Sequence, residues 1–195
     1  MISPTVTTSK LSGIDDYFLR VIAPTTDYAR KGAEYHYTNQ GHRRIAAAYD
    51  LRNSAYSENW LADYRRAFVA LGGEIVTTEA YASGDETDFV RMAERLLAQR
   101  PDAVLIIANS VDTAMLAQQL HKRDPAVHVT ASEWAATERL TELGGKAIEG
   151  MVIAQFLDRE STAPAYVAFR NAYVERFALE PGFAGITGFD AANVV

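Results

Sequence analysis

The chain contains no cysteine, which excludes a disulfide framework, a zinc–thiolate site and a cysteine nucleophile. Cysteine-free proteins occur in both the cytoplasm and the periplasm, so this absence does not indicate a compartment. No apolar run approaches the roughly 18 residues that a membrane-spanning helix needs, and we expect no direct membrane insertion. The opening segment MISPTVTTSKLSG also lacks the basic and apolar regions of a signal peptide.

Positive charge is also scarce. The 25 acidic residues exceed the 19 lysines and arginines, which gives a formal net charge of −6. The basic residues occur singly or in pairs such as Arg43–Arg44 and Arg65–Arg66, without a continuous basic stripe. A nucleic-acid partner is therefore not expected.

Motifs of common enzyme classes are missing as well. The sequence has no GxGxxG, GxxxxGK[ST] or GxSxG pattern, so it offers no dinucleotide loop, NTP loop or nucleophile elbow. His36, His42, His121 and His128 fall on separate predicted elements, and we expect no metal site from them. Asp15–Asp16 is interpreted as a solvated turn. The sequence therefore names no catalytic residue and no cofactor.

Strand-like and helix-like segments alternate from Arg43 onward. Strands are predicted at 43–50, 74–82, 103–108 and 127–132, and helices at 58–71, 89–97, 111–122 and 135–143. The segment AVLIIA (103–108) has no polar alternation, which is typical of a parallel strand covered on both faces. The pattern predicts an α/β fold, a Rossmann-like parallel sheet with helices on both faces.

The pattern changes after Gly150. MVIAQFL (151–157) predicts a last strand, and Tyr166, Phe169, Tyr173 and Phe177 share one face of a predicted helix. GFAGITGFDAANVV (182–195) predicts the start of another helix that ends without a cap.

Ligands of open parallel sheets bind at the carboxyl ends of the strands. Three predicted strands end near Tyr56, Ser110 and the pair Glu133–Trp134. An aromatic ring, a hydroxyl and a carboxylate suit a small zwitterionic or polar ligand, with the carboxylate facing an ammonium. The alternative is that both aromatics are ordinary edge residues and Glu133 caps a helix.

The chain resembles the periplasmic leucine/isoleucine/valine-binding protein family. The likeness rests on motifs in family order: ISPTVTTSKLS, YFLRV, RRIAAAYDLRNSAYS, GDETDF, PDAVLIIA, SEW, EGMVIAQF and GFDA. That resemblance implies a type I periplasmic binding fold and an extracytoplasmic substrate-binding protein of an ABC transporter. Its partners would be a small-molecule ligand, an amino acid or a related compound, and the transporter permease.

The resemblance also implies a domain arrangement. Residues 1–21 would be the end of a first lobe and the first crossover, 22–150 the core of the second lobe, and 151–195 a return crossover with partial first-lobe helices. Much of the first lobe, and a signal peptide, would then lie upstream. A fragment of this kind is expected to bind its ligand poorly alone.

Individual site residues follow from the same resemblance. Thr5 and Thr7 match the loop that holds the ligand's carboxylate and ammonium, Tyr56 the tyrosine that lies against the ligand, and Glu133 the acid that pairs with the ammonium. This sequence departs from the family where Ser110 and Phe183 replace tyrosines and Trp134 replaces a small residue. Trp134 and Phe183 suggest a pocket for an aromatic ligand.

Two other functions stay open. The same fold serves in signalling receptors and in cytoplasmic amide-type regulators, where the ligand is sensed rather than transported. An unrecognised α/β enzyme is the second possibility, although the sequence offers no nucleophile, cofactor loop or metal cluster for one.

Overall fold

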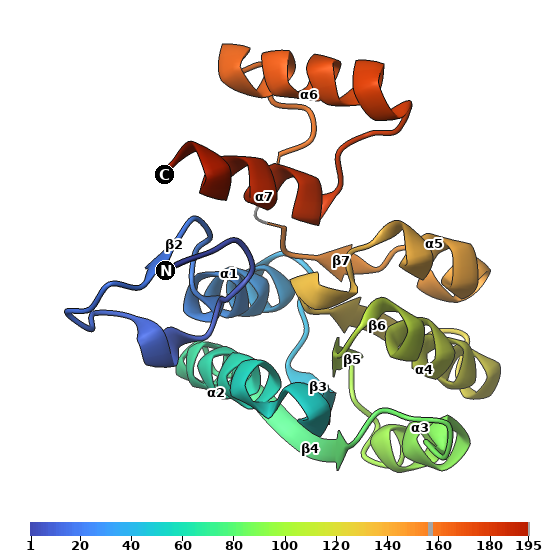
Figure 1. The fold of residues 1–195 in the computed structure, drawn as a ribbon. Coiled ribbons are helices and arrows are strands. Elements are labelled where there is room, and N and C mark those ends of the chain that lie inside the picture. The colour runs from blue at the N-terminus through green and yellow to red at the C-terminus, as the bar shows by residue number, and fades with distance from the viewer. Residues whose placement is uncertain (156–157, 195) are drawn as a thin grey trace.

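The computed structural model describes residues 1–155 and 158–194. In this part of the chain the central sheet has five strands in the order β4-β3-β5-β6-β7 (Figure 1). The strands are β3 (Arg44–Asp50), β4 (Glu74–Tyr81), β5 (Ala103–Ile107), β6 (His128–Ala131) and β7 (Val152–Ile153). Every neighbouring pair is parallel. The predicted α/β class with a parallel sheet is confirmed.

Helices cover both faces of this sheet. The helices α1 (Thr25–Thr38) and α2 (Ser54–Ala70) pack on one face, and α3 (Phe89–Leu97), α4 (Ser110–Arg123) and α5 (Glu138–Gly144) on the other. Successive side chains of a strand point to opposite faces. Ile45 and Ala47 accordingly join the core beneath α1 and α2, whereas Ala46 and Ala48 join the core beneath α3 and α4.

Helix α1 is an element that the sequence pattern did not predict. Its buried face consists of Thr25, Tyr28, Ala29, Gly32, Ala33 and His36. Small and polar residues dominate that face, so no apolar stripe marks the helix in the sequence. The helix nevertheless packs closely on α2, because its small side chains let the two backbones approach.

Helix α2 begins four residues before the predicted start at 58 and ends one residue before the predicted end at 71. Trp60, Tyr64 and Phe68 are buried on one stripe, but Leu71, which was assigned to the same stripe, is 36% exposed. The helix has already ended at Ala70, and Gly72 adopts a φ of +100°. Glycine tolerates this left-handed conformation, so the predicted glycine stop is confirmed.

Two predicted elements are shorter in the structure. The helix expected at 135–143 is divided into a 3₁₀ turn at Glu133–Ala135 and helix α5. The strand expected over MVIAQFL pairs with the sheet only at Val152–Ile153, and its positions 156–157 lie outside the described residues. The turn at Glu133–Ala135 places Glu133 directly after β6.

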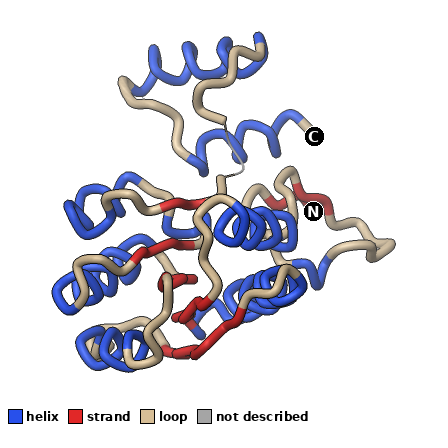
Figure 2. The backbone as a smooth tube through the Cα atoms, turned by 180° about the vertical axis from the view of Figure 1, so that it is seen from behind, coloured by secondary structure: helices blue, strands red, loops and turns tan. Residues whose placement is uncertain are grey.

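The two ends of the chain lie beyond the sheet. β1 (Ile2–Ser3) and β2 (Leu19–Arg20) form a separate parallel pair. Helices α6 (Pro164–Phe177) and α7 (Phe183–Asn193) lie past the β7 edge, with α7 between α6 and the sheet (Figures 1 and 2). Within the described residues, no helix combines the length and apolar character needed to cross a membrane.

Candidate ligand-binding site

A cavity of about 400 Å³ opens at the carboxyl ends of the strands. Its walls come from both chain ends and from the loops after β3 and β6. The lining residues are Thr5, Thr7, Ile22, Asn53, Tyr56, Glu133, Trp134, Ala136, Thr137, Gln155, Arg159 and Phe183. All residues that the sequence predicted for the site, except Ser110, therefore lie around one space.

Tyr56 is placed by the turn that follows β3. The strand ends at Asp50, which is 1% exposed, and its Oδ1 accepts hydrogen bonds from the backbone N–H groups of Arg52 at 2.9 Å and Ser83 at 3.0 Å. The hydroxyl of Ser57 donates to the Asp50 carbonyl at 2.6 Å. These bonds fix the start of α2 and hold Tyr56 in its first turn, at the edge of the cavity.

Glu133 is placed in a similar way at the end of β6. The backbone N–H of Ser132 donates to the Ile106 carbonyl at 3.0 Å, which ties the strand end to β5. The next residue, Glu133, opens the 3₁₀ turn, and its Oε2 accepts a hydrogen bond from Nε1 of Trp60 at 2.8 Å. One carboxylate oxygen is thus bound within the protein.

The second oxygen has no such partner. Oε1 of Glu133 and the hydroxyl of Tyr56 are shielded from solvent, and neither makes a hydrogen bond of good geometry among the described residues. The two groups are nevertheless close enough that each shifts the pKa of the other. Burial raises the pKa of Glu133, and its own backbone N–H, the indole of Trp60 and the hydroxyl of Tyr56 oppose that rise. Buried polar atoms in folded proteins nearly always have partners. These two atoms can therefore receive a ligand group that donates hydrogen bonds, and a cation would offset the desolvation of the carboxylate.

The threonine-rich loop near the N-terminus closes another side of the cavity. The carbonyl of Thr7 accepts a hydrogen bond from the N–H of Thr25 at 2.8 Å, at the start of α1. Asn59 on α2 donates from Nδ2 to Oγ1 of Thr8 at 2.9 Å. The loop is thereby tied to both helices of one face, with Thr7 buried and Thr5 exposed at the cavity.

Apolar and aromatic side chains complete the walls. The ring of Trp134 meets that of Tyr56 edge to face, with centroids 5.4 Å apart and planes at 76°. Ile22 and Phe183, the latter at the first position of α7, lie on the cavity as well. This lining suits a ligand with one polar, charged end and one apolar end.

Ser110 does not reach this cavity. It is 9% exposed in the first turn of α4, where Oδ1 of Asn109 accepts from the N–H groups of Val111 at 2.9 Å and Asp112 at 3.0 Å. Nearby, the hydroxyl of Tyr81 lies 3.1 Å from Oδ2 of Asp112. This strand end is therefore occupied by a helix cap, and a ligand contact at Ser110 stays a prediction of the family resemblance.

Several cavity residues were missed from the sequence. Asn53 falls within the family motif RRIAAAYDLRNSAYS but received no role. Gln155 lies within the motif EGMVIAQF but received no role, and no local pattern distinguishes Arg159. Trp60 does not line the cavity but contacts Glu133, and it was missed too. It lies four residues after Tyr56 and so on the same side of α2, a helical spacing that could have marked it.

The histidines are scattered in sequence, but three of them are close in space. The rings of His42 and His128 are 5.1 Å apart, and those of His36 and His42 are 6.3 Å apart. They lie at the amino-terminal edge of the sheet, away from the cavity. Among the described residues, no group of three or more His, Cys, Asp or Glu side chains could hold a metal ion.

Comparison with known proteins agrees with this architecture. The family model described as periplasmic binding protein matches residues 1–195. The chain belongs to that family. None of the curated proteins matches the sequence.

Solved structures of similar fold include three informative cases. The first is a leucine binding protein from Thermotoga maritima MSB8, with 24% identity, a TM-score of 0.90, and coverage of 100% of this chain and 55% of that chain. The second is a branched-chain amino acid transporter substrate binding protein from Streptococcus pneumoniae in complex with isoleucine, with 17% identity, a TM-score of 0.84, and coverage of 99% and 55%. The third is a solute binding protein of an ABC transporter from Rhodopseudomonas palustris BisB5 in complex with 3,4-dihydroxybenzoic acid, with 21% identity, a TM-score of 0.81, and coverage of 99% and 53%. These likenesses show the fold, and the chain spans about half the length of each.

Proposed function

We propose that this chain is part of an extracytoplasmic solute-binding protein of an ABC transporter and that it binds an amino acid. One observation carries the choice of ligand: Oε1 of Glu133 is buried at the cavity without a hydrogen-bond partner. An ammonium group is the ligand group that best satisfies a buried carboxylate oxygen, because the bond is charge-assisted. Family membership supports the transport role.

The proposed binding mode assigns each wall to one part of the ligand. Glu133 and Tyr56 face the ammonium, the loop with Thr5 and Thr7 faces the carboxylate, and the wall with Trp134 and Phe183 faces the side chain. Hydrogen bonds to charged groups in a desolvated site contribute about 1.5–3 kcal/mol each. The protein forms and breaks no covalent bond in this mechanism.

Two lobes would close on the ligand by a hinge motion. In this proposal residues 1–21 and 151–195 belong to one lobe and its crossovers, and residues 22–150 form the other lobe. The cavity supports this division, because its walls come from both groups of residues. A permease in the membrane would then recognise the closed form.

Aromatic acids are a second candidate ligand class. Trp134 and Phe183 give the cavity two aromatic walls, and one protein of similar fold holds 3,4-dihydroxybenzoic acid. The ionised carboxylate of an aromatic acid without an amino group would, however, bring a second negative charge toward the Glu133 carboxylate. An amino acid with an aromatic side chain would satisfy both features.

Isothermal titration calorimetry of the full-length protein tests the proposal with leucine, phenylalanine and 3,4-dihydroxybenzoate. We expect an amino acid to bind and Glu133→Gln to weaken it by about 10- to 100-fold, since a charge-assisted bond of 1.5–3 kcal/mol is lost. Glu58→Gln makes the same charge change at an exposed position on α2 and should leave affinity unchanged. Tight binding of dihydroxybenzoate without any amino acid would overturn the proposal.

A further inference from the structure

Trp60 is a buried residue of α2 with a fixed orientation. It is 1% exposed, and its ring stacks on Tyr64 with centroids 5.5 Å apart and planes at 15°. Tyr64 stacks in turn on Phe68, at 5.4 Å and 19°. The three rings pack at helical spacing against the sheet, so the indole has little freedom to rotate.

This orientation determines which oxygen of Glu133 remains for a ligand. An indole has a single N–H donor and no acceptor, and Trp60 uses that donor on Oε2 of Glu133 at 2.8 Å. Oε1 is buried without a hydrogen bond of good geometry, and it is left at the cavity close to the hydroxyl of Tyr56. Tyr56 and Trp60 come from adjacent turns of the same helix, so α2 supplies both groups that flank the carboxylate.

We propose that Trp60 is a positioning residue that holds the Glu133 carboxylate with Oε1 toward the ligand, and that it thereby makes the site select ligands with a protonated amine over the corresponding deaminated acids. This inference rests on the proposed function. It adds a residue that lies outside the cavity wall and acts only through Glu133.

The physical reason lies in the balance of charge at a buried carboxyl. Burial raises the pKa of Glu133, and the indole N–H is one of three donors, with the Glu133 backbone and the Tyr56 hydroxyl, that stabilise the charged form and oppose that rise. Without the indole, Oε2 would also be a buried acceptor without a partner. The carboxyl would then rotate to find a donor or take up a proton. A neutral carboxyl attracts an ammonium less and repels a bare carboxylate less, so selectivity falls.

Binding measurements on the full-length protein test the consequence for selectivity. The ligand pairs are leucine with 4-methylpentanoate and phenylalanine with 3-phenylpropanoate. We expect Trp60→Phe to weaken the amino acids by about 10-fold or more and to change the deaminated acids by less than about threefold. The acid limb of amino-acid binding should also move to higher pH, because the pKa of Glu133 rises. If Trp60→Phe weakened the binding of an amino acid and of its deaminated acid by the same factor, the inference would be overturned.

A core variant separates this effect from general destabilisation. Leu96 is fully buried on α3, on the opposite face of the sheet. Leu96→Val should weaken both members of each pair equally or not at all, and it should leave the pH profile of binding in place. A change of selectivity in Leu96→Val equal to that in Trp60→Phe would show that Trp60 acts through stability alone.

An experiment without ligand tests the contact itself and separates its failure from failure of the proposed function. The indole N–H resonance of Trp60, assigned by its loss in Trp60→Phe, should shift with pH as Glu133 titrates. In Glu133→Gln the resonance should stay constant over the same pH range. If no amino acid binds but the resonance titrates, the proposed function fails and the positioning contact stands. A resonance that titrates equally in Glu133→Gln refutes the contact.

Discussion

His36 and Thr130, which are 94 residues apart in sequence, are joined by a buried hydrogen bond of 2.9 Å between Nε2 and Oγ1. The hydroxyl of Thr130 already donates its proton to the carbonyl of Val152 at 2.6 Å, so it must accept from His36. Nε2 therefore carries the hydrogen, and Nδ1 accepts from the hydroxyl of Tyr64 at 2.8 Å. A neutral ring completes this chain of bonds, which connects α2, α1, β6 and β7.

Folding should therefore be less favourable in mild acid. Burial, aided by the nearby His42, lowers the pKa of His36 to about 4, against 6.5 for a free histidine. The unfolded chain binds more protons between these values, so the full stability is present above pH 6.5 and declines as pH falls toward 4. The difference corresponds to about 3 kcal/mol. Urea unfolding at a series of pH values measures it.

A matched histidine provides the control. His121→Asn, on α4, should keep the wild-type pH profile, whereas His36→Gln should flatten the profile and lower stability at pH 7. His42, whose pKa burial also lowers, contributes in the same direction and leaves some slope in the His36 variant. A wild-type stability that does not change between pH 7 and 5 would contradict the neutral ring.

Gly73 should not tolerate a side chain. A Cβ at this position would lie 2.2 Å from a ring carbon of Phe68, which is fully buried and stacked on Tyr64. The ring cannot move away, so we expect Gly73→Ala to destabilise the protein by about 1–3 kcal/mol. Gly188→Ala, in α7 with open space around it, should instead be neutral or stabilising by up to about 1 kcal/mol. Equilibrium denaturation of both variants checks the difference.

Removal of the Tyr56 hydroxyl should lower the affinity for the ligand while changing the stability of the protein little. The hydroxyl is buried beside the Glu133 carboxyl without a hydrogen bond of good geometry, so Tyr56→Phe should change the melting temperature little. Affinity for the ligand should fall by about 3- to 10-fold, the equivalent of one neutral hydrogen bond. Calorimetry of binding and of thermal unfolding on the same variant tests both halves. A variant that loses stability but keeps its affinity would assign Tyr56 to packing alone.

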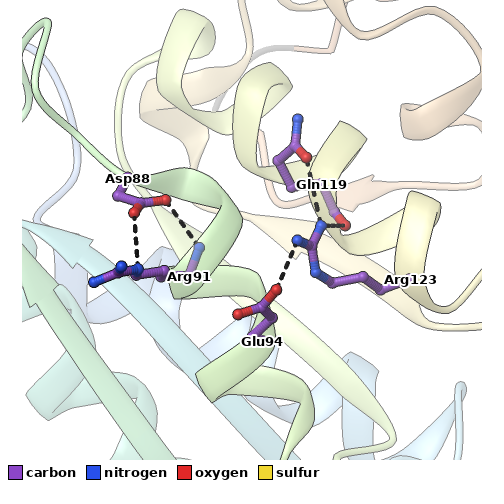
Figure 3. Close-up of polar contacts among 5 residues, drawn as sticks. All are labelled: Asp88, Arg91, Glu94, Gln119 and Arg123. Carbon is purple, nitrogen blue, oxygen red and sulfur yellow. Dashed lines mark hydrogen bonds and ion pairs between the residues drawn. The ribbon is translucent and has the colours of Figure 1, made fainter.

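The ion pair between Arg123 and Glu94 should contribute little to the stability of the fold. Figure 3 shows Arg123 of α4 reaching Glu94 of α3, with Nη2 and Oε1 2.9 Å apart, while Nη1 donates to the Gln119 carbonyl at 3.1 Å. The Glu94 side chain is 57% exposed, so solvent and salt screen the pair. We expect Arg123→Ala to destabilise the protein by less than about 1 kcal/mol, with a smaller effect in 1 M salt. A loss of several kcal/mol in urea unfolding would refute this expectation.

The sequence by itself determined the fold class and strands β3, β4, β5 and β6 of the sheet. Fully apolar segments such as 103–108 and the glycine pair after α2 are local signals. Strands and helix ends can be predicted from such signals without knowledge of tertiary contacts. Strand ends could also be located, and this was enough to place Tyr56 and Glu133 at one edge. Because ligands of open parallel sheets bind at the carboxyl ends of the strands, this edge could be predicted as the binding site.

Only the tertiary structure decided which polar groups satisfy one another. Helix α1 escaped prediction because its buried face is small and polar, and Ser110 begins helix α4, after the cap residue Asn109, rather than lining the cavity. The bond from Trp60 to Glu133 spans 73 residues, so no local pattern contains it. Burial and pairing of polar atoms depend on contacts between distant segments, and those contacts exist only once the sheet has assembled.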